Sequence, residues 1–279
     1  MSNYQQLIEK RWEQGHFLCV GLDTDYAKLA PRYPGVPVAE ALFRFNRAII
    51  DATAAYCCAF KPNSAFYEGY GPAGLEGLIR TNQYIRETYP DHPIILDAKR
   101  ADIGNTNQGY VKAAFEICAA HAITVHPYLG KEALQPFLSN PAIGVIVLCH
   151  TSNPGAAEFQ ELSGAGELLY QTVARRVAET WNENHNCSLV VGATYPEQIA
   201  AVRKIVGDLP LLIPGIGAQG GDLRQTVIHA LDSRGMGMII NASRSILYAS
   251  AGADFATAAA REAQKLDQAI RALIGEIRG

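Results

Sequence analysis

The stretch PIILDAKRADIGNT, residues 93–106, joins a short apolar run to a charged segment, and a helical pattern follows over residues 106–119. A strand that is hydrophobic along its whole length is typical of a parallel sheet that is covered by helices on both faces. The order of strand, charged turn and helix therefore predicts one β/α unit of a parallel α/β fold.

Similar apolar runs recur along the whole chain. The eight runs are FLCVGLD from residue 17, YCCAFKP from 56, PIILDAK from 93, AITVHPY from 122, IGVIVLC from 143, CSLVVGA from 187, LLIPGIG from 211 and MGMIINA from 236. Helical patterns occupy residues 39–56, 75–89, 106–119, 166–184, 196–206 and 255–277. Eight alternations of strand and helix predict a (β/α)8 TIM barrel, and a doubly wound open sheet is the alternative.

Length and composition are consistent with one barrel. The 279 residues fit the size of a single (β/α)8 domain, and no Pro- or Ser-rich linker divides residues 1–279. Hydrophobic residues make up 48% and charged residues 18%, so the chain can bury a large core. A net charge of −3 without a basic run argues against nucleic acid or an anionic membrane as a partner.

The N-terminal segment and the cysteines predict a cytoplasmic protein. Residues 1–16, MSNYQQLIEKRWEQGH, are polar and charged where a secretory signal needs an apolar region. The apolar runs are much shorter than a membrane span. The six cysteines have no C-x-x-C spacing, which favours buried reduced thiols over a zinc or redox site.

Charged residues follow the first three apolar runs. Asp23 ends the first run, Lys61 ends the second, and Asp97 and Lys99 lie at the end of the third. A spacing of two places the last pair on one side of a regular strand. Because barrel enzymes hold their active sites at the carboxyl ends of the strands, we expect the four residues to form one alternating cluster there. A purely structural ion-pair network is the alternative.

Two loops near the C-terminus predict a phosphate site. PGIGAQGGD, residues 214–222, follows the seventh run, and NASRS, residues 241–245, follows the eighth. Barrels most often bind phosphate in these two loops. Backbone amides of the glycines, a helix that starts near Asp222, the amide of Gln219 and the guanidinium of Arg244 are the expected donors. A glycine-rich turn with a purely structural role is the alternative. The pattern G-x-x-x-x-G-K-[ST] of a nucleotide-binding P-loop is absent from the sequence.

The loop after the fifth run has the character of a mobile lid. TSNPGAAEFQELSGAG, residues 151–166, is long and rich in small residues. Ser152 lies in it without the partners of a nucleophilic serine, which favours a hydrogen-bonding role. His126 and His150 also end strands. A structural role is favoured, because no histidine pair has the helix spacing of a metal site, and a role as ligands or acid/base groups is the alternative.

The segment DAKRADIGNT, residues 97–106, resembles the signature D-x-K-x-x-D-I-x-x-T of the orotidine 5′-phosphate decarboxylases. The resemblance extends over the whole chain through GLD, FKP, TSNPG, PGIGAQGGD and SRS, and it is closest to the longer bacterial branch. It implies a (β/α)8 barrel, a homodimer, and a carboxy-lyase that converts orotidine 5′-phosphate to UMP and CO₂ in pyrimidine biosynthesis without a cofactor or metal.

The resemblance also implies catalytic roles for the charged residues. Lys99 would donate a proton to C6 of the pyrimidine, and Asp97 would lie beside the substrate carboxylate. Asp23 and Lys61 would hold the ribose hydroxyls and join the charge network. Asp25 could compete for the role of Asp23, but it lies beyond the strand end.

Binding roles follow in the same way. Asp102 would enter the active site of the partner subunit and complete a Lys–Asp–Lys–Asp chain, and Thr106 would meet the ribose there. Ser152 would contact the pyrimidine edge, while Gln219 and Arg244 would contact the phosphate.

Other functions are compatible with parts of the pattern. Metal-dependent sugar-phosphate decarboxylases or aldolases of the same superfamily share D-x-K-x-x-D, but Lys61 and Lys99 would oppose a divalent cation. A Schiff-base aldolase needs a neutral lysine, whereas two adjacent aspartates favour a charged one. A non-catalytic sensor of phosphoribosyl ligands would not need the Asp/Lys array.

Overall fold

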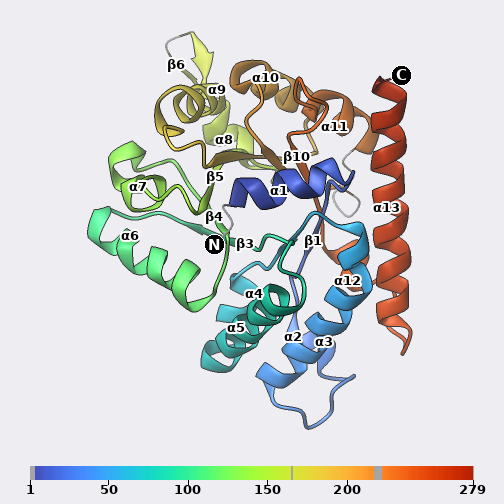
Figure 1. Ribbon diagram of the computed structural model, residues 1–279. Coiled ribbons are helices and arrows are strands. Elements are labelled where there is room, and N and C mark those ends of the chain that lie inside the picture. The colour runs from blue at the N-terminus through green and yellow to red at the C-terminus, as the bar shows by residue number, and fades with distance from the viewer. Residues whose placement is uncertain (1–3, 165, 217–221, 279) are drawn as a thin grey trace.

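The chain folds into an eight-stranded parallel barrel. The computed structural model describes residues 4–164, 166–216 and 222–278. The main sheet has the strand order β2-β1-β10-β9-β8-β5-β4-β3 (Figure 1). Two isolated parallel bridges, Phe60–Ile94 and Asn63–Asp97, join β2 to β3 and complete the ring. Strands that follow one another along the chain are therefore neighbours in the sheet, which confirms the predicted (β/α)8 barrel.

The barrel strands coincide with the eight apolar runs. They are β1 (Leu18–Gly21), β2 (Ala59–Lys61), β3 (Ile95–Arg100), β4 (Ala122–Val125), β5 (Gly144–His150), β8 (Cys187–Val191), β9 (Leu211–Pro214) and β10 (Met238–Ala242). Most of their residues are buried, because one face of the sheet lines the packed interior and the other contacts the helices. This two-sided burial explains why the strands appear in the sequence as continuous apolar runs.

Helices surround the barrel on its outer side, as Figure 1 shows. The helices of the described residues are α1 (Tyr4–Glu13), α2 (Tyr26–Leu29), α3 (Val38–Thr53), α4 (Ala65–Glu68), α5 (Gly71–Thr88), α6 (Gly104–Val111), α7 (Gly130–Leu138), α8 (Ala156–Gln160), α9 (Leu169–Arg176), α10 (Pro196–Val206), α11 (Leu223–Ala230), α12 (Arg244–Leu247) and α13 (Phe255–Arg278). A 3-10 turn, Ala54–Tyr56, follows α3, and π-helical turns, Lys112–Ile117 and Val177–Trp181, extend α6 and α9. The sequence patterns do not include α7, which contains Pro136.

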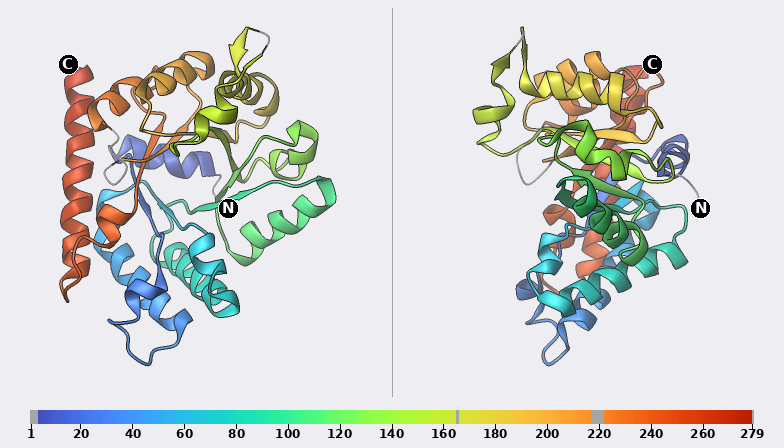
Figure 2. Two further views of the ribbon diagram at one scale, coloured as in Figure 1. Left: turned by 180° about the vertical axis from the view of Figure 1, so that it is seen from behind. Right: turned by 90° about the vertical axis from the view of Figure 1, so that its left-hand side faces the viewer.

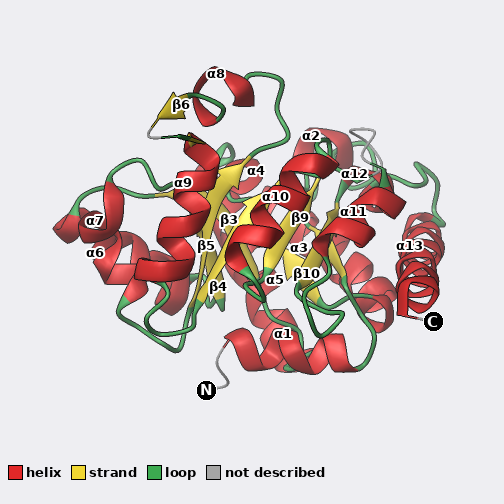
Figure 3. Cartoon of the chain, turned by 90° about the horizontal axis from the view of Figure 1, so that it is seen from above, coloured by secondary structure: helices red, strands yellow, loops and turns green. Residues whose placement is uncertain are grey.

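Helix α1 closes the amino-terminal end of the barrel. It lies across one end of the strands, and α8 lies beyond the other end (Figure 3). Tyr4, Ile8 and Trp12 are buried on one side of α1. At Gly144, where β5 begins, an added Cβ would lie 2.4 Å from the Tyr4 ring, so only glycine fits beneath the helix. A ligand can therefore enter from the carboxyl ends of the strands.

The loop predicted to be a lid has secondary structure of its own. It contains α8 and the strand β6 (Ser163–Gly164), which pairs with β7 (Glu167–Leu168) in an antiparallel hairpin. Figure 2 shows this hairpin standing away from the barrel. The mobility of the lid stays a prediction.

All six cysteines are buried as free thiols, as the sequence predicts. Burial raises the pKa of Cys19 to about 12, so this thiol stays protonated at neutral pH. Within the three described ranges, no helix is both long enough and apolar enough to cross a lipid bilayer.

Candidate active site

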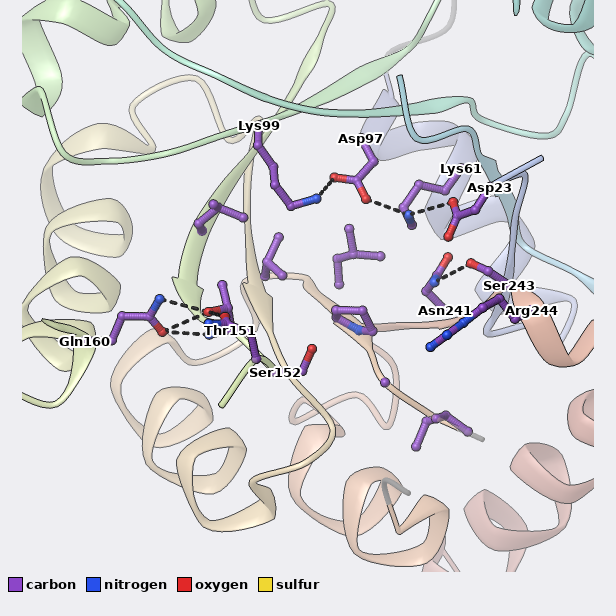
Figure 4. A pocket seen from close by; sticks show the side chains of 17 residues that line it. Asp23, Lys61, Asp97, Lys99, Thr151, Ser152, Gln160, Asn241, Ser243 and Arg244 are labelled. Carbon is purple, nitrogen blue, oxygen red and sulfur yellow. Dashed lines mark hydrogen bonds and ion pairs between the residues drawn. The ribbon is translucent and has the colours of Figure 1, made fainter. Parts of the chain in front are cut away.

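A cavity of about 490 Å³ lies at the carboxyl ends of the barrel strands. Figure 4 shows side chains from β1, β2, β3 and the loops after β5 and β10 around it. Six of the nine residues that the sequence predicts for the site line this cavity: Asp23, Lys61, Asp97, Lys99, Ser152 and Arg244. The sequence pattern and the cavity therefore point to the same end of the barrel.

The four charged side chains form a chain of ion pairs. Lys99 Nζ lies 2.5 Å from Asp97 Oδ1, and Lys61 Nζ lies 2.8 Å from Asp97 Oδ2. Lys61 Nζ is also 4.0 Å from Asp23 Oδ1. The order is Lys99, Asp97, Lys61, Asp23, so positive and negative charges alternate across the cavity wall (Figure 4).

Burial and charge act against each other in this chain. Burial alone would raise the pKa of Asp97, but the ammonium groups of Lys61 and Lys99 outweigh it and hold that pKa below its usual range. Burial likewise opposes the charge on Lys61, but Asp97 and Asp23 outweigh it and raise the pKa of Lys61 above its usual range. Both groups are ionised at neutral pH. The Lys99 side chain is 49% exposed, so a ligand can reach its ammonium group.

Lys99 reaches Asp97 through an irregular strand end. Its φ of 47° lies in the left-handed region, which residues other than glycine rarely adopt. The register between β3 and β4 shifts between Leu96 and Arg100, which marks a bulge. The two side chains meet, as the spacing of two predicts, although the strand end is irregular.

Thr124 of β4 holds this bulge in place, and the sequence analysis missed it. Its side chain is buried, and its hydroxyl donates to Asp97 Oδ1 at 2.9 Å. Thr124 Oγ1 also accepts from the backbone N–H of Lys99 at 2.9 Å. One hydroxyl thus fixes both the carboxylate and the backbone that carries the ammonium group. A single threonine inside an apolar run gives no signal of this role.

Asp23 is held by a buried polar network around the end of β1. The Tyr67 hydroxyl donates to the carbonyl oxygen of Leu22 at 2.8 Å, and the Thr24 hydroxyl donates to Asn46 Oδ1 at 2.6 Å. Asn46 Nδ2 in turn donates to the Tyr67 oxygen at 3.0 Å. Because these three side chains are fully buried, the backbone on both sides of Asp23 is fixed.

Asp25, the competing aspartate, has a different position. Its side chain accepts from the backbone N–H of Ala27 at 3.0 Å and so caps α2. It also accepts from the Tyr70 hydroxyl at 2.9 Å. Asp25 is not part of the cavity wall that the described residues form, whereas Asp23 is.

Ser152 faces the cavity from the start of the lid. Gln160, at the end of α8, accepts from the backbone N–H of Thr151 at 2.8 Å and donates to the Thr151 hydroxyl at 2.9 Å. A Cβ added to Gly192 would lie 2.8 Å from the backbone of Ser152, so the absence of a side chain there lets Ser152 pack closely. Gln160 also lines the cavity and was not predicted.

The two strand-end histidines make local contacts. His150 is fully buried, and its Nε2 lies 3.0 Å from Glu161 Oε1 in the lid. His126 Nε2 lies 3.1 Å from the carbonyl oxygen of Ala101. Both contacts agree with the structural interpretation.

The phosphate side of the cavity is described only in part. Gln219 and most of the predicted glycine loop lie outside the described residues. Asp222 accepts from the backbone N–H of Gln225 at 3.0 Å, so a carboxylate already caps α11. Arg244 begins α12 and is exposed at the cavity, and its guanidinium makes no hydrogen bond or ion pair with any other described residue. It is thus free to bind an anion.

Asp102 and Thr106 lie away from this cavity. Asp102 follows β3, and its Oδ1 accepts from the backbone N–H of Ile103 at 2.6 Å. Thr106 is exposed in the first turn of α6. Neither residue is part of the cavity wall of its own chain, as far as the described residues define it.

Comparison with known proteins places this geometry in a family. The model of the orotidine 5′-phosphate decarboxylase / HUMPS family matches residues 16–261. The orotidine 5′-phosphate decarboxylase of Azoarcus sp. (strain BH72) is 48% identical over 272 residues, which cover 97% of this chain and 99% of that protein. The structure of Leishmania donovani OMP decarboxylase has a TM-score of 0.82 and 38% identity, and the match covers 97% of this chain and 99% of the other.

A larger relative shares the same barrel. The structure of Leishmania donovani UMP synthase matches with a TM-score of 0.84 and 39% identity, and the match covers 97% of this chain but 57% of the synthase. The chain thus spans little more than half of that protein. The length of the family match and the identity of the Azoarcus relative show that the chain belongs to the orotidine 5′-phosphate decarboxylase / HUMPS family.

Proposed function

We propose that the chain converts orotidine 5′-phosphate to UMP and carbon dioxide in pyrimidine biosynthesis, without a cofactor. The observation that carries this proposal is the ion-paired array of Lys99, Asp97, Lys61 and Asp23 in a cavity that the guanidinium of Arg244 also lines. The array offers an accessible ammonium group at one end, and Arg244 offers an anion site at the other (Figure 4). The names of the relatives support the same reaction.

Lys99 is the proposed proton donor. When the bond between C6 and the carboxyl carbon breaks, the electron pair stays on C6 in the plane of the ring, where the ring carbonyls cannot delocalise it. A fixed ammonium group stabilises this charge electrostatically. The proton on Nζ then moves to C6 to form UMP, and the neutral amine regains a proton from water.

Asp97 has two proposed effects. It would repel the substrate carboxylate, and two such charges about 4 Å apart interact by about 4 kcal/mol at an effective dielectric constant of 20. Its ion pairs with Lys61 at 2.8 Å and Lys99 at 2.5 Å offset part of this repulsion. We therefore assign the larger share of the rate to stabilisation of the carbanion, and the main role of Asp97 is to keep Lys99 charged and oriented.

The remaining roles complete the nucleotide site. Asp23 and Lys61 would hold the ribose hydroxyls, Ser152 would contact the pyrimidine edge, and Gln219 and Arg244 would bind the phosphate. The chain would act as one barrel domain in the cytoplasm.

A homodimer with shared active sites is the proposed assembly. Asp102 and Thr106 are not among the described residues that line the cavity of their own chain, and Thr106 is exposed. Ile103 is 63% exposed and Tyr128 is 87% exposed at the same end of the barrel. Exposed apolar side chains at this end of the barrel support a surface that a second copy covers.

A cofactor-free assay tests the proposed function. The absorbance of orotidine 5′-phosphate is followed in the presence of a metal chelator, and UMP and CO₂ are quantified. Turnover that persists with chelator supports the proposal. Absent turnover, or turnover that the chelator stops, contradicts it, and the second result would favour a metal-dependent reaction of the same barrel superfamily.

Replacement of Thr124 by Val should lower kcat by about 10- to 100-fold, because the hydrogen bonds to a charged carboxylate and to the Lys99 backbone are lost. KM should change little, whereas the unfolding temperature should fall by a few degrees, because the backbone N–H of Lys99 loses its acceptor. Steady-state kinetics and thermal unfolding check this. Thr124→Ser keeps the hydroxyl and should retain most of kcat. A wild-type kcat for Thr124→Val would show that Thr124 does not position Lys99.

Replacement of Arg244 by Ala should weaken UMP binding by about 10- to 100-fold, the typical value for a charge-assisted hydrogen-bonded pair. Titration calorimetry with UMP measures the effect. Uridine lacks the phosphate, so its affinity should be the same for the wild type and the variant. Unchanged UMP affinity would remove Arg244 from the phosphate site.

A further inference from the structure

Asn241 presents an unpaired acceptor at the cavity. It lies in β10 just before the strand ends, it is 6% exposed, and it is part of the cavity wall. Its Nδ2 donates to Ser243 Oγ at 3.3 Å, whereas its Oδ1 has no hydrogen-bond partner among the described residues. A buried amide oxygen without a donor is unfavourable, which indicates that a ligand supplies the donor.

A second unpaired acceptor lies just after the neighbouring strand β1. Asp23 Oδ1 is buried and has no hydrogen-bond partner within the described part of the chain, although Lys61 Nζ lies 4.0 Å away. Strands β1 and β10 pair in parallel with Cys19 opposite Asn241. A Cβ added to Gly21 would lie 3.2 Å from Asn241 Oδ1, so the carboxamide oxygen lies against the end of β1 that carries Asp23.

In the structure the amide nitrogen of Asn241 contacts Ser243, and the amide oxygen is left for a ligand. Figure 4 shows Asn241 between the Asp23–Lys61 pair and Arg244. The described part of the cavity thus holds two acceptors without donors near the Lys61 ammonium group and Arg244. This arrangement fits a ligand with hydroxyl groups.

The proposed substrate has hydroxyls in this region. With its phosphate at Arg244 and its base at Lys99, the ribose lies between them, and the 3′-hydroxyl is nearer to the phosphate along the sugar than the 2′-hydroxyl. We infer that Asn241 is a specificity-determining residue that accepts a hydrogen bond from the ribose 3′-hydroxyl. This inference rests on the proposed function and adds a residue to its site.

Deoxynucleotides test the inference through binding. The dissociation constants of UMP, 2′-deoxy-UMP and 3′-deoxy-UMP are measured by calorimetry for the wild type and for Asn241→Ala. For each protein, the dissociation constant of 3′-deoxy-UMP is divided by that of UMP. We expect this ratio to be about tenfold smaller in Asn241→Ala than in the wild type. The loss from UMP to 2′-deoxy-UMP should be the same in both proteins.

Two further variants separate recognition from stability. Asn241→Asp keeps an acceptor, so it should retain discrimination against 3′-deoxy-UMP even if the added charge weakens both ligands. Asn186 is buried just before β8 at the opposite end of the barrel, where it donates to the carbonyl oxygen of Ile143 at 3.1 Å. Asn186→Ala should reduce the unfolding temperature and leave the discrimination unchanged.

The outcomes are distinct. Full discrimination against 3′-deoxy-UMP in Asn241→Ala overturns the inference, and it would mean that Asn241 only supports Asp23. A loss of 2′-deoxy discrimination instead overturns the assignment to the 3′-hydroxyl. In both cases the wild type still binds UMP and releases CO₂. A wild type that does neither would show that the proposed function itself is wrong.

Discussion

Replacement of Lys99 by Ala is expected to lower decarboxylation by about 10⁴-fold or more, because it removes both the charge that stabilises the carbanion and the proton donor. No other residue can substitute within the described site. Lys61 is 3% exposed and lies between Asp97 and Asp23, so its ammonium group is not available to the ring. UMP binding should persist, since Arg244 and the ribose contacts are unchanged.

Two variants make this result specific. Lys99→Arg keeps a positive charge but does not release a proton at accessible pH, so its kcat should stay close to that of Lys99→Ala if proton transfer is essential. Lys204→Ala removes an exposed lysine from α10, away from the cavity, and should keep wild-type kinetics. CO₂ release and UMP affinity are measured for each variant. Wild-type-like turnover by Lys99→Ala would rule out the assigned role.

The fold could be predicted because its signals are local. Each barrel strand is buried on both faces and therefore appears as a continuous apolar run. Helix α10 was predicted at residues 196–206 and has these bounds, since Pro196 is its first residue and Gly207, with φ 58°, follows its last. Helix α7, which contains the poor helix former Pro136, is absent from the predicted helical patterns.

The charged part of the site could also be predicted, because charges at the ends of apolar runs are conspicuous. Thr124, Gln160 and Asn241 could not, since neutral side chains are common at such positions. Their roles depend on what the register and the backbone place beside them. Thr124 contacts the backbone of Lys99, whose φ is 47°, and Ser243, which Asn241 contacts, packs against β1 because Gly21 has no side chain.

Asp102 and Thr106 are a different case, because their predicted site requires a second copy of the chain. Replacement of Asp102 by Ala should lower kcat by about 100- to 1000-fold if its carboxylate completes the charge array across an interface. Mixing this variant with Lys99→Ala should then restore activity. A hybrid dimer contains one site with Lys99 from one chain and Asp102 from the other, and its second site lacks both.

The decarboxylase activity that mixing can restore has an upper limit. Random exchange makes half of the dimers hybrids, each with one intact site of two, so about a quarter of all sites should be active. The mixture is assayed for CO₂ release after subunit exchange has been verified with differently tagged chains. Lys61→Ala mixed with Lys99→Ala is the matched control, because both residues line the cavity of their own chain and no hybrid site is intact. Verified exchange without recovery would place Asp102 outside the partner's site. Recovery in the experiment but not in the control would mean that one chain alone cannot assemble the full array of charges.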